Sequence, residues 1–261
     1  MIDNPFFLMS APVAFETTSF EIPASPGVNL TNDNMDMDWR SQGLNGIYVV
    51  LRCTAPVDTI AVLHSNLRAS DTIRVRAGAS VSNGEIVSPV YDSGAVAAYE
   101  GNLFAPYTPK SMIDLGQTVQ TVFWRLDFVS PGNPDGQVRA ARILMGERFE
   151  VSSGIDYNWK KGQIDDSVLT SGPNYEDVQE FAARPTVKAK LGNMDEATFN
   201  RFDAFMMAVG KSKPVLFAPE PDNPDTVQHW TVYGRFKVDW SGENLYHNWW
   251  ETEIQVDGLR S

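Results

Sequence analysis

The sequence predicts a mainly β protein, in which an N-terminal antiparallel β-sandwich is followed by a smaller β-rich domain with one α-helix. Three observations support this fold class. Between Gly46 and Gly146, short apolar or alternating runs follow one another closely, turn-forming clusters separate them, and no amphipathic helix interrupts them. Many strands without crossover helices favour an antiparallel sandwich of the jelly-roll type.

The expected strands of the sandwich differ in the number of faces that they bury. They lie at residues 47–53, 59–63, 73–77, 122–128 and 142–145. The first two are largely apolar on both faces, which is typical of strands that are covered on both sides. The third and fourth alternate between apolar and polar residues, which indicates one solvated face. Arg74 and Arg76 stand on the polar face of the third strand, and we expect each to pair with an acidic side chain.

The character of the sequence changes near residue 152. We therefore expect the sandwich domain at 1–152 and a second, β-rich domain at 153–261. Residues 156–184 are polar and rich in turn-forming residues, with scattered aromatics, which is typical of a hairpin or an extended arm. Such a segment cannot bury a core alone, and it would gain order against another subunit.

One helix is expected in the second domain, at residues 194–209. Asn193 can cap its N-terminus with Glu196 three residues later, apolar residues recur at helical spacing, and Gly210 can end it. A half-buried antiparallel strand is expected at 230–240, because apolar and polar residues alternate there.

The charge and the cysteine content exclude several classes of partner. A net charge of −12 repels phosphate backbones and anionic lipid headgroups, so we expect neither nucleic-acid binding nor membrane insertion. Cys53 is the single cysteine, which excludes an internal disulfide and a zinc site built from several thiolates. Asp3 stands where a signal peptide would carry positive charge, and Pro5 interrupts the apolar run, so we expect synthesis in a cytoplasm.

The sequence contains none of the usual catalytic motifs. It lacks a glycine-rich phosphate loop, GxGxxG, GxSxG and HExxH, and its three histidines are widely separated. The adjacent Asp165 and Asp166 would point to opposite faces of an extended chain, which makes them a poor acid and base couple. We expect no enzyme activity, no cofactor and no metal ligands, although the oxygen-rich residues 32–36 fit either a solvated loop or a hard-cation site without EF-hand spacing.

A sugar-binding surface is one interpretation of the stretch NDNMDMDWRSQG. Trp39 offers a flat apolar face, and Arg40 beside it can bind hydroxyl groups. The alternative is that Trp39 fills one end of the sandwich core, as large aromatics usually do.

Five short motifs occur in an order that resembles a known family. They are WR at 39–40, VDTIA at 57–61, HSNL at 64–67, RVR at 74–76 and a YDSG turn at 91–94. This order resembles the galactose-binding-like (discoidin-type) jelly roll found in tail proteins of long-tailed bacteriophages. The sequence departs from the family pattern by one inserted residue, Ser65.

The resemblance implies a structural component of a bacteriophage tail tip or baseplate, made in the bacterial host cytoplasm and located in the virion tail. It implies assembly with other phage tail proteins, a homo-oligomeric ring, and a jelly roll that binds carbohydrate such as a host surface glycan. The residues we assign to carbohydrate binding are Trp39, Arg40, His64 and Asn66. Those we assign to the assembly arm are its aromatics, Tyr157, Trp159, Tyr175 and Phe181.

Alternatives remain at the level of function and of single residues. The chain could be a free-standing, lectin-like carbohydrate-binding module, or a glycoside hydrolase with dispersed carboxylates. His64 and Asn66 could instead be strand-end residues that bind backbone groups freed where an apolar strand leaves the core.

Overall fold

A computed structural model of the chain describes residues 4–105, 107–151, 154–156, 158–173, 175–237 and 240–259. The chain divides into two compact units. The first comprises Met1–Glu150 together with Ala218–Thr231, and the second comprises Val151–Phe217 together with Val232–Ser261. The domains expected from the sequence were contiguous ranges, whereas the first unit also includes the later segment Ala218–Thr231.

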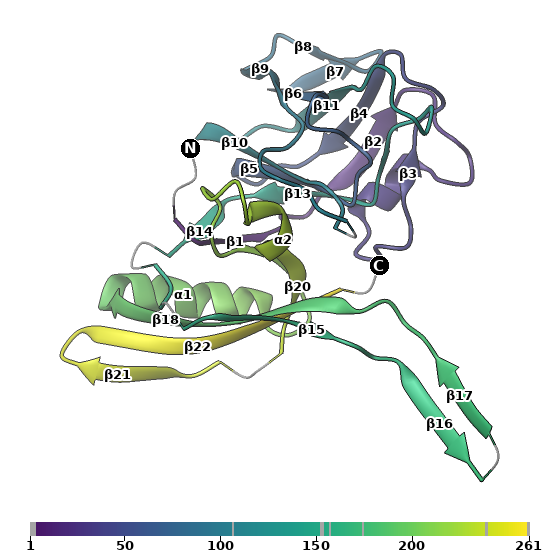
Figure 1. Cartoon of the computed structure of the whole chain (residues 1–261). Coiled ribbons are helices and arrows are strands. Elements are labelled where there is room, and N and C mark those ends of the chain that lie inside the picture. The colour runs from purple at the N-terminus through teal and green to yellow at the C-terminus, as the bar shows by residue number, and fades with distance from the viewer. Residues whose placement is uncertain are drawn as a thin grey trace. The chain divides into compact units, whose positions relative to one another are not determined.

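The first unit contains the expected antiparallel β-sandwich (Figure 1). One sheet has five strands, in the order β2 (Ala14–Thr18), β4 (Ile47–Arg52), β11 (Phe123–Val129), β6 (Thr72–Gly78) and β9 (Tyr91–Ala97). The other has three, in the order β10 (Lys110–Val119), β5 (Val57–Leu63) and β13 (Arg142–Gly146). Neighbouring strands in both sheets are antiparallel. The expected fold class, mainly β with a sandwich in the first half, is confirmed.

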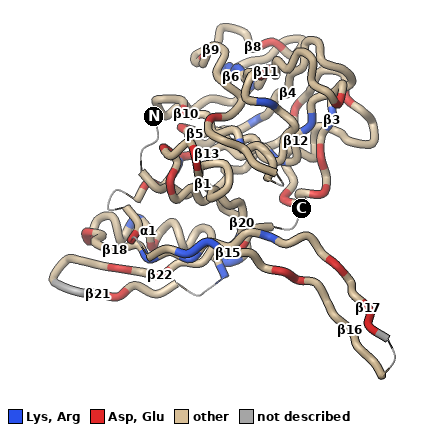
Figure 2. Tube along the Cα trace, in the orientation of Figure 1, with Lys and Arg blue, Asp and Glu red and all other residues tan. Residues whose placement is uncertain are grey.

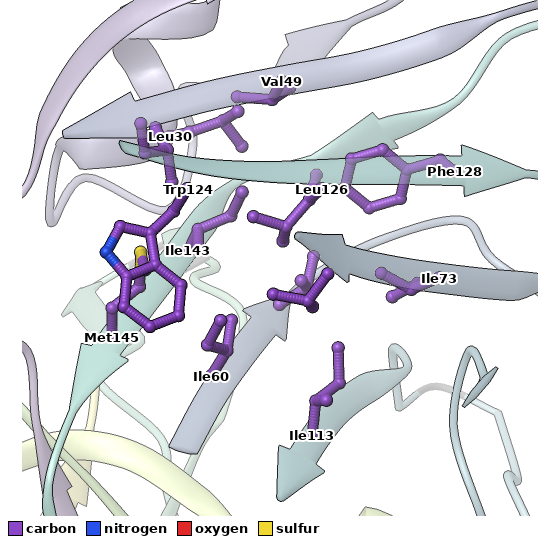
Figure 3. Close-up of a cluster of buried hydrophobic side chains, with 14 of the residues drawn as sticks. Leu30, Val49, Ile60, Ile73, Ile113, Trp124, Leu126, Phe128, Ile143 and Met145 are labelled. Atoms are coloured by element: carbon purple, nitrogen blue, oxygen red, sulfur yellow. The ribbon is translucent and has the colours of Figure 1, made fainter. Parts of the chain in front are cut away.

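The core of the sandwich lies between these two sheets (Figure 3). Trp124, Leu126 and Phe128 project into it from β11, as the alternating sequence predicted. Ile60 of β5 and Ile143 of β13 meet them from the three-stranded sheet. Each of these five side chains is at most 2 % exposed, so burial of apolar area is the main force that holds the two sheets together.

The outer face of the five-stranded sheet carries a network of ion pairs. Arg74 pairs with Asp92, and Arg76 pairs with both Asp127 and Glu85 at 2.8 Å. The hydrogen bond from Arg74 is the main cause that lowers the pKa of Asp92 to about 2. The expectation that both arginines of the RVR strand pair with acids is confirmed.

The YDSG motif forms part of a strand and not the expected turn. Residues 91–94 belong to β9, which pairs with β6 through a register shift between Arg74 and Arg76. At this irregularity the Ser93 hydroxyl accepts a hydrogen bond from the Val75 N–H at 2.9 Å, and Gly94 adopts a φ of 63°. A glycine suits such a left-handed position, so a motif that reads as a turn can instead mark a bulge.

Short elements complete the first unit. They are β1 (Phe6–Met9) with β14 (Arg148–Glu150), β3 (Trp39–Arg40) with β12 (Arg139–Ala140), β7 (Ser80–Ser82) with β8 (Glu85–Val87), a 3-10 turn at Gly27–Thr31, and α2 (Val227–Trp230). The strand expected at 230–240 begins later, as β20 (Val232–Phe236), because Trp230 ends α2, and residues 238 and 239 of the expected range lie outside the described residues. The backbone N–H of Trp230 donates to the backbone carbonyl of Thr226 at 2.8 Å, as in a helix.

The second unit is a sheet with a helix packed on one face (Figure 1). Its strands follow the order β19 (Val215–Ala218), β20, β22 (Trp249–Gly258), β18 (Arg184–Asp195) and β15 (Lys160–Ile164), with β21 (Gly242–Tyr246) also paired to β22. The helix is α1 (Glu196–Val209), which buries Phe202, Met206 and Val209. No helix in the described part of the chain is long and apolar enough to cross a membrane.

The N-terminus of α1 differs from the expected one by two residues. Asp195, and not Asn193, is the N-cap, and its carboxylate accepts a hydrogen bond from the Thr198 N–H at 2.7 Å. The reason is tertiary, because Met194 and Asp195 still pair with β22 and so cannot be helical. Gly210 ends the helix, as expected.

The polar arm is a hairpin. β16 (Val168–Gly172) and β17 (Tyr175–Gln179) pair with each other as a separate two-stranded sheet. Its base is held by an Arg184–Asp166 ion pair of 2.8 Å and by the Ser167 hydroxyl, which accepts from the Phe181 N–H at 3.0 Å. Of the two possibilities that the sequence left open, a hairpin and an extended arm, the chain forms the hairpin.

Replacing the observed cap tests the helix start. We expect Asp195→Ala to lower the midpoint temperature of thermal unfolding by roughly 2 to 4 °C, because one backbone N–H loses its acceptor. Asp195→Asn keeps an acceptor at that position and should leave the midpoint nearly unchanged. Circular dichroism melts of the full chain measure both; an unchanged midpoint for Asp195→Ala would contradict the assignment.

Candidate functional site

Tertiary pairing brings three of the four predicted carbohydrate-binding residues to one rim of the sandwich. Arg40 of β3 lies directly opposite Arg139 of β12. Asn66 donates from its N–H to the Arg139 carbonyl at 3.3 Å, and its side-chain oxygen accepts from the Arg139 N–H at 2.9 Å. His64 lies two residues before Asn66, where β5 ends. We call Arg40, His64, Arg139 and the nearby Asp36 the rim cluster.

Asn66 has a structural role at this rim. Its side-chain amide donates to the backbone carbonyl of Gln137 at 2.9 Å and to the Asp135 carboxylate at 2.8 Å. The side-chain amide of Asn133 donates to the backbone carbonyl of Asn66 at 3.1 Å. With the two bonds to Arg139, its polar groups are all engaged within the protein. Asn66 therefore closes the 133–139 loop onto the end of β5, as the strand-end alternative proposed.

Trp39 offers no face to a ligand. Its side chain is 0 % exposed, and its ring lies 5.7 Å from the ring of Phe128. Its indole N–H has no hydrogen-bond acceptor among the described residues. This placement fits the alternative interpretation, in which Trp39 fills one end of the sandwich core.

His64 is held neutral at the rim. It adopts a φ of 51°, an uncommon left-handed conformation for a non-glycine residue, at the point where the chain turns away from β5. Burial is the main cause that lowers its pKa to about 4, and the charges of Lys110 and Arg139 lower it further, while Asp36 acts in the opposite direction. At neutral pH its imidazole therefore has one donor and one acceptor nitrogen.

The two arginines of the rim cluster differ in their partners. Arg40 donates from Nε to both carboxylate oxygens of Asp38, at 3.0 and 2.9 Å. The Arg139 side chain is exposed and forms no ion pair or hydrogen bond with any described residue. Since like charges that face each other across a strand pair repel, this part of the rim favours an incoming hydrogen-bond acceptor.

Two aromatic residues that the sequence did not single out lie against His229 of α2. The ring of His229 is 4.8 Å from that of Phe104 and 5.1 Å from that of Tyr107. Lys110 connects them to the rim, because it pairs with Leu63, the residue before His64, and its ammonium lies 5.8 Å from the Tyr107 ring. Phe104 is 59 % exposed and so presents an apolar face to solvent.

The segment Ala218–Thr231 supports these aromatics from within the first unit. The side-chain amide of Gln228 in α2 exchanges two hydrogen bonds with the backbone of Lys110, at 2.9 and 3.1 Å. The backbone carbonyl of Gln228 accepts a third hydrogen bond from the Lys110 ammonium at 2.5 Å. No local motif could have revealed this contact, since the two residues are 118 positions apart.

The predicted arm residues have separate surroundings. Trp159 is partly exposed, and its backbone N–H donates to the backbone carbonyl of Asp156 at 3.2 Å. Phe181 is 38 % exposed at the base of the hairpin. The backbone of Tyr175 pairs with Gly172 in the hairpin, and Tyr157 lies outside the described residues.

The oxygen-rich loop at residues 32–36 uses its side chains locally. Asn32 and Asn34 each accept a hydrogen bond from the backbone N–H two residues later, at 2.9 and 3.1 Å, and Asp33 pairs with Arg142 at 3.1 Å. In the described part of the chain, no group of three or more His, Cys, Asp or Glu side chains is placed to hold a metal ion.

No protein-family model and no curated protein matches the sequence. Several solved structures are similar. A CBM32 module of a family 31 glycoside hydrolase from Clostridium perfringens is 15% identical, with 52% of this chain and 91% of that chain covered and a TM-score of 0.39. A chitosan-binding module from a Paenibacillus sp. IK-5 chitosanase/glucanase is 10% identical (54% and 97% covered, TM-score 0.37). A striped bass serum fucolectin is 11% identical (95% and 92% covered, TM-score 0.37).

These similar structures are a CBM32 module, a chitosan-binding module and a lectin. Their TM-scores lie below 0.5, so the sandwich fold rests on the strand order and the antiparallel pairing described above. None of the three is described as a bacteriophage protein.

Truncating Trp39 tests its assignment to the core. We expect Trp39→Ala to lower the free energy of unfolding by about 3 to 5 kcal/mol, because it leaves a large cavity. Trp39→Phe keeps a ring and breaks no hydrogen bond of the indole, so it should cost less. Urea denaturation followed by far-UV circular dichroism measures both, and an Ala variant as stable as the wild type would contradict the assignment.

The neutral state of His64 predicts a pH dependence of stability. Its pKa is about 4 in the folded chain and near 6.5 when unfolded, so the unfolded state binds the extra proton between these values and stability falls with acidification. Acidification from pH 7 to pH 4.5 should lower the free energy of unfolding of the wild type more than that of His64→Asn. We expect the difference to be on the order of 1 to 2 kcal/mol in favour of the variant. Asn is a residue type that tolerates the left-handed backbone.

The exposed His247 provides the control. Urea denaturation at the two pH values should show a larger relative gain for His64→Asn than for His247→Asn. Equal pH dependence of both variants would contradict a neutral, partly buried His64.

Proposed function

We propose that the first unit binds a glycan at the rim cluster. The observation that carries the proposal is the exposed side chain of Arg139, which pairs with none of the residues that the structure describes, beside the neutral imidazole of His64. An arginine left without an acid partner is unusual in this unit, where Arg74 and Arg76 are each paired.

The chemistry of the rim cluster suits hydroxyl groups. Each sugar hydroxyl can both donate and accept a hydrogen bond. Arg139 supplies donors, the exposed carboxylate of Asp36 supplies acceptors, and neutral His64 supplies one of each. Phe104, elsewhere in the first unit, exposes an apolar ring of the kind on which the C–H face of a sugar can pack. Because Trp39 is buried, it is not the apolar platform, and the proposal keeps the lectin-like function with different residues.

Glycan binding by the full chain tests this function. A glycan array identifies the ligand, and titration calorimetry then measures its dissociation constant. We expect Arg139→Ala to weaken binding at least roughly tenfold with an unchanged melting temperature, because a partner-free side chain contributes little to stability.

Arg52→Ala is the matched control, since Arg52 is an exposed arginine on β4 of the same unit. It should bind as the wild type does. Absence of binding to every glycan on the array, or equal affinity of the Arg139 variant and the wild type, would overturn the proposal.

A second candidate function is the structural role in a bacteriophage tail tip or baseplate that the sequence resemblance implies. The observation that favours it is the β16–β17 hairpin, whose apolar residues Leu169 and Val178 are 62 % and 48 % exposed. Proteomics and electron microscopy of purified particles test it, because a tail component must be present in the particle at a fixed copy number. The two functions are compatible, since the rim cluster and the hairpin belong to different units.

A further inference from the structure

The hairpin of the second unit exposes apolar side chains that it cannot bury by itself. Leu169 and Val178 face each other across the ribbon, and Val168 on the next position is 50 % exposed. Among the described residues, β16 and β17 pair only with each other. An isolated two-stranded hairpin is marginally stable in water, so this ribbon is suited to packing against another surface.

The hairpin is also acidic. Residues 165–183 contain five acidic residues and neither lysine nor arginine, namely Asp165, Asp166, Glu176, Asp177 and Glu180. Asp166 is paired with Arg184 at the base, but Glu176, Asp177 and Glu180 form no ion pair with any described residue. The surface that receives the hairpin should therefore be basic as well as partly apolar.

A basic strand edge of this kind exists in the same unit. β15 ends the sheet order, so one of its edges has no partner among the described strands. Lys160 of β15 lies directly opposite Lys188 of β18, and Figure 2 shows the cluster of basic residues there. Lys188 reaches Glu253 at 3.0 Å, whereas Lys160 is exposed and has no carboxylate partner in the described part of the chain. Two lysines that face each other repel, and an incoming carboxylate would relieve the repulsion.

We propose that the β16–β17 hairpin of one copy docks along the β15 edge of a second copy. In this contact the hairpin extends the second copy's sheet, and its carboxylates approach Lys160 and Lys188. Lysines on an exposed edge oppose pairing with neutral or basic strands, but they admit an acidic one. The contact joins two different surfaces, so it builds a head-to-tail assembly that forms a ring if the rotation closes.

The hairpin cannot make this contact within its own chain. Only residues 165–167 separate the end of β15 from the start of β16. The Arg184–Asp166 and Ser167–Phe181 contacts hold the base, so the hairpin continues past the end of β15 (Figure 1) and does not fold back along it. The receiving edge must come from another molecule.

The overall charge of the chain opposes this association. Each copy carries a net charge of −12, which opposes approach of a second copy. The attraction is therefore local, between the hairpin acids and the lysine pair, and reversal of a single charge on either side should change it strongly.

Sedimentation velocity of the full chain over a range of concentrations tests the proposal. The wild type should form species larger than the monomer as concentration rises. Lys160→Glu and Asp177→Lys should each weaken association at least roughly tenfold, and the double variant should regain most of it, because the charges are exchanged between the two surfaces. Lys211→Glu, an exposed lysine after α1, makes the same charge change elsewhere and should associate as the wild type does.

Circular dichroism melts confirm that each variant is folded before its association is compared. A second variant, Leu169→Ser, removes apolar area without changing charge and should also weaken association. A wild type that stays monomeric at every concentration would overturn the proposal. Equal association of the wild type and both single reversals, or no recovery in the double variant, would overturn the assignment of the edge. None of these results depends on glycan binding at the rim cluster.

Discussion

The organisation of the first unit depends on one constraint, which is the burial of β5 on both faces. This strand is central in its sheet, between β10 and β13, and six of its seven residues are buried. A strand that is apolar on both faces must leave the core abruptly, and every polar backbone group freed at its end needs a partner. His64 takes the left-handed turn, and Asn66 supplies the hydrogen bonds. The rim cluster is a consequence of how this strand ends.

Charge is distributed unevenly over the molecule, although its total is strongly negative. On the outer face of the five-stranded sheet the arginines are paired with acids, which keeps that face solvated and locally neutral. In contrast, Arg139 at the rim and Lys160 at the sheet edge lack acid partners among the described residues. Exposed paired charges contribute little to stability, so the pairing mainly decides which surfaces remain available to other molecules.

The two units therefore offer two different kinds of surface. The rim cluster combines hydrogen-bond donors and acceptors, which suits a small hydroxyl-rich ligand. The hairpin and the β15 edge combine exposed apolar residues with opposite charges, which suits a protein contact. The segment Ala218–Thr231 belongs to the first unit although it lies between strands of the second, so the chain passes between the units more than once. A simple division of the sequence into two halves does not describe such a chain.

The sequence by itself determined the properties that depend on neighbouring residues. Alternation in β11, the continuous apolar run of β5 and the helical spacing before Gly210 are local patterns, and each appears in the structure where the pattern predicted it. The helix start at Asp195, the bulge at residues 91–94 and the burial of Trp39 required tertiary pairing. The candidate site also depends on tertiary pairing. Arg139 faces Arg40, and Gln228 reaches Lys110, only because strand register and chain return bring distant residues together. Register and long-range packing minimise the free energy of the whole chain, so no short stretch of sequence contains them.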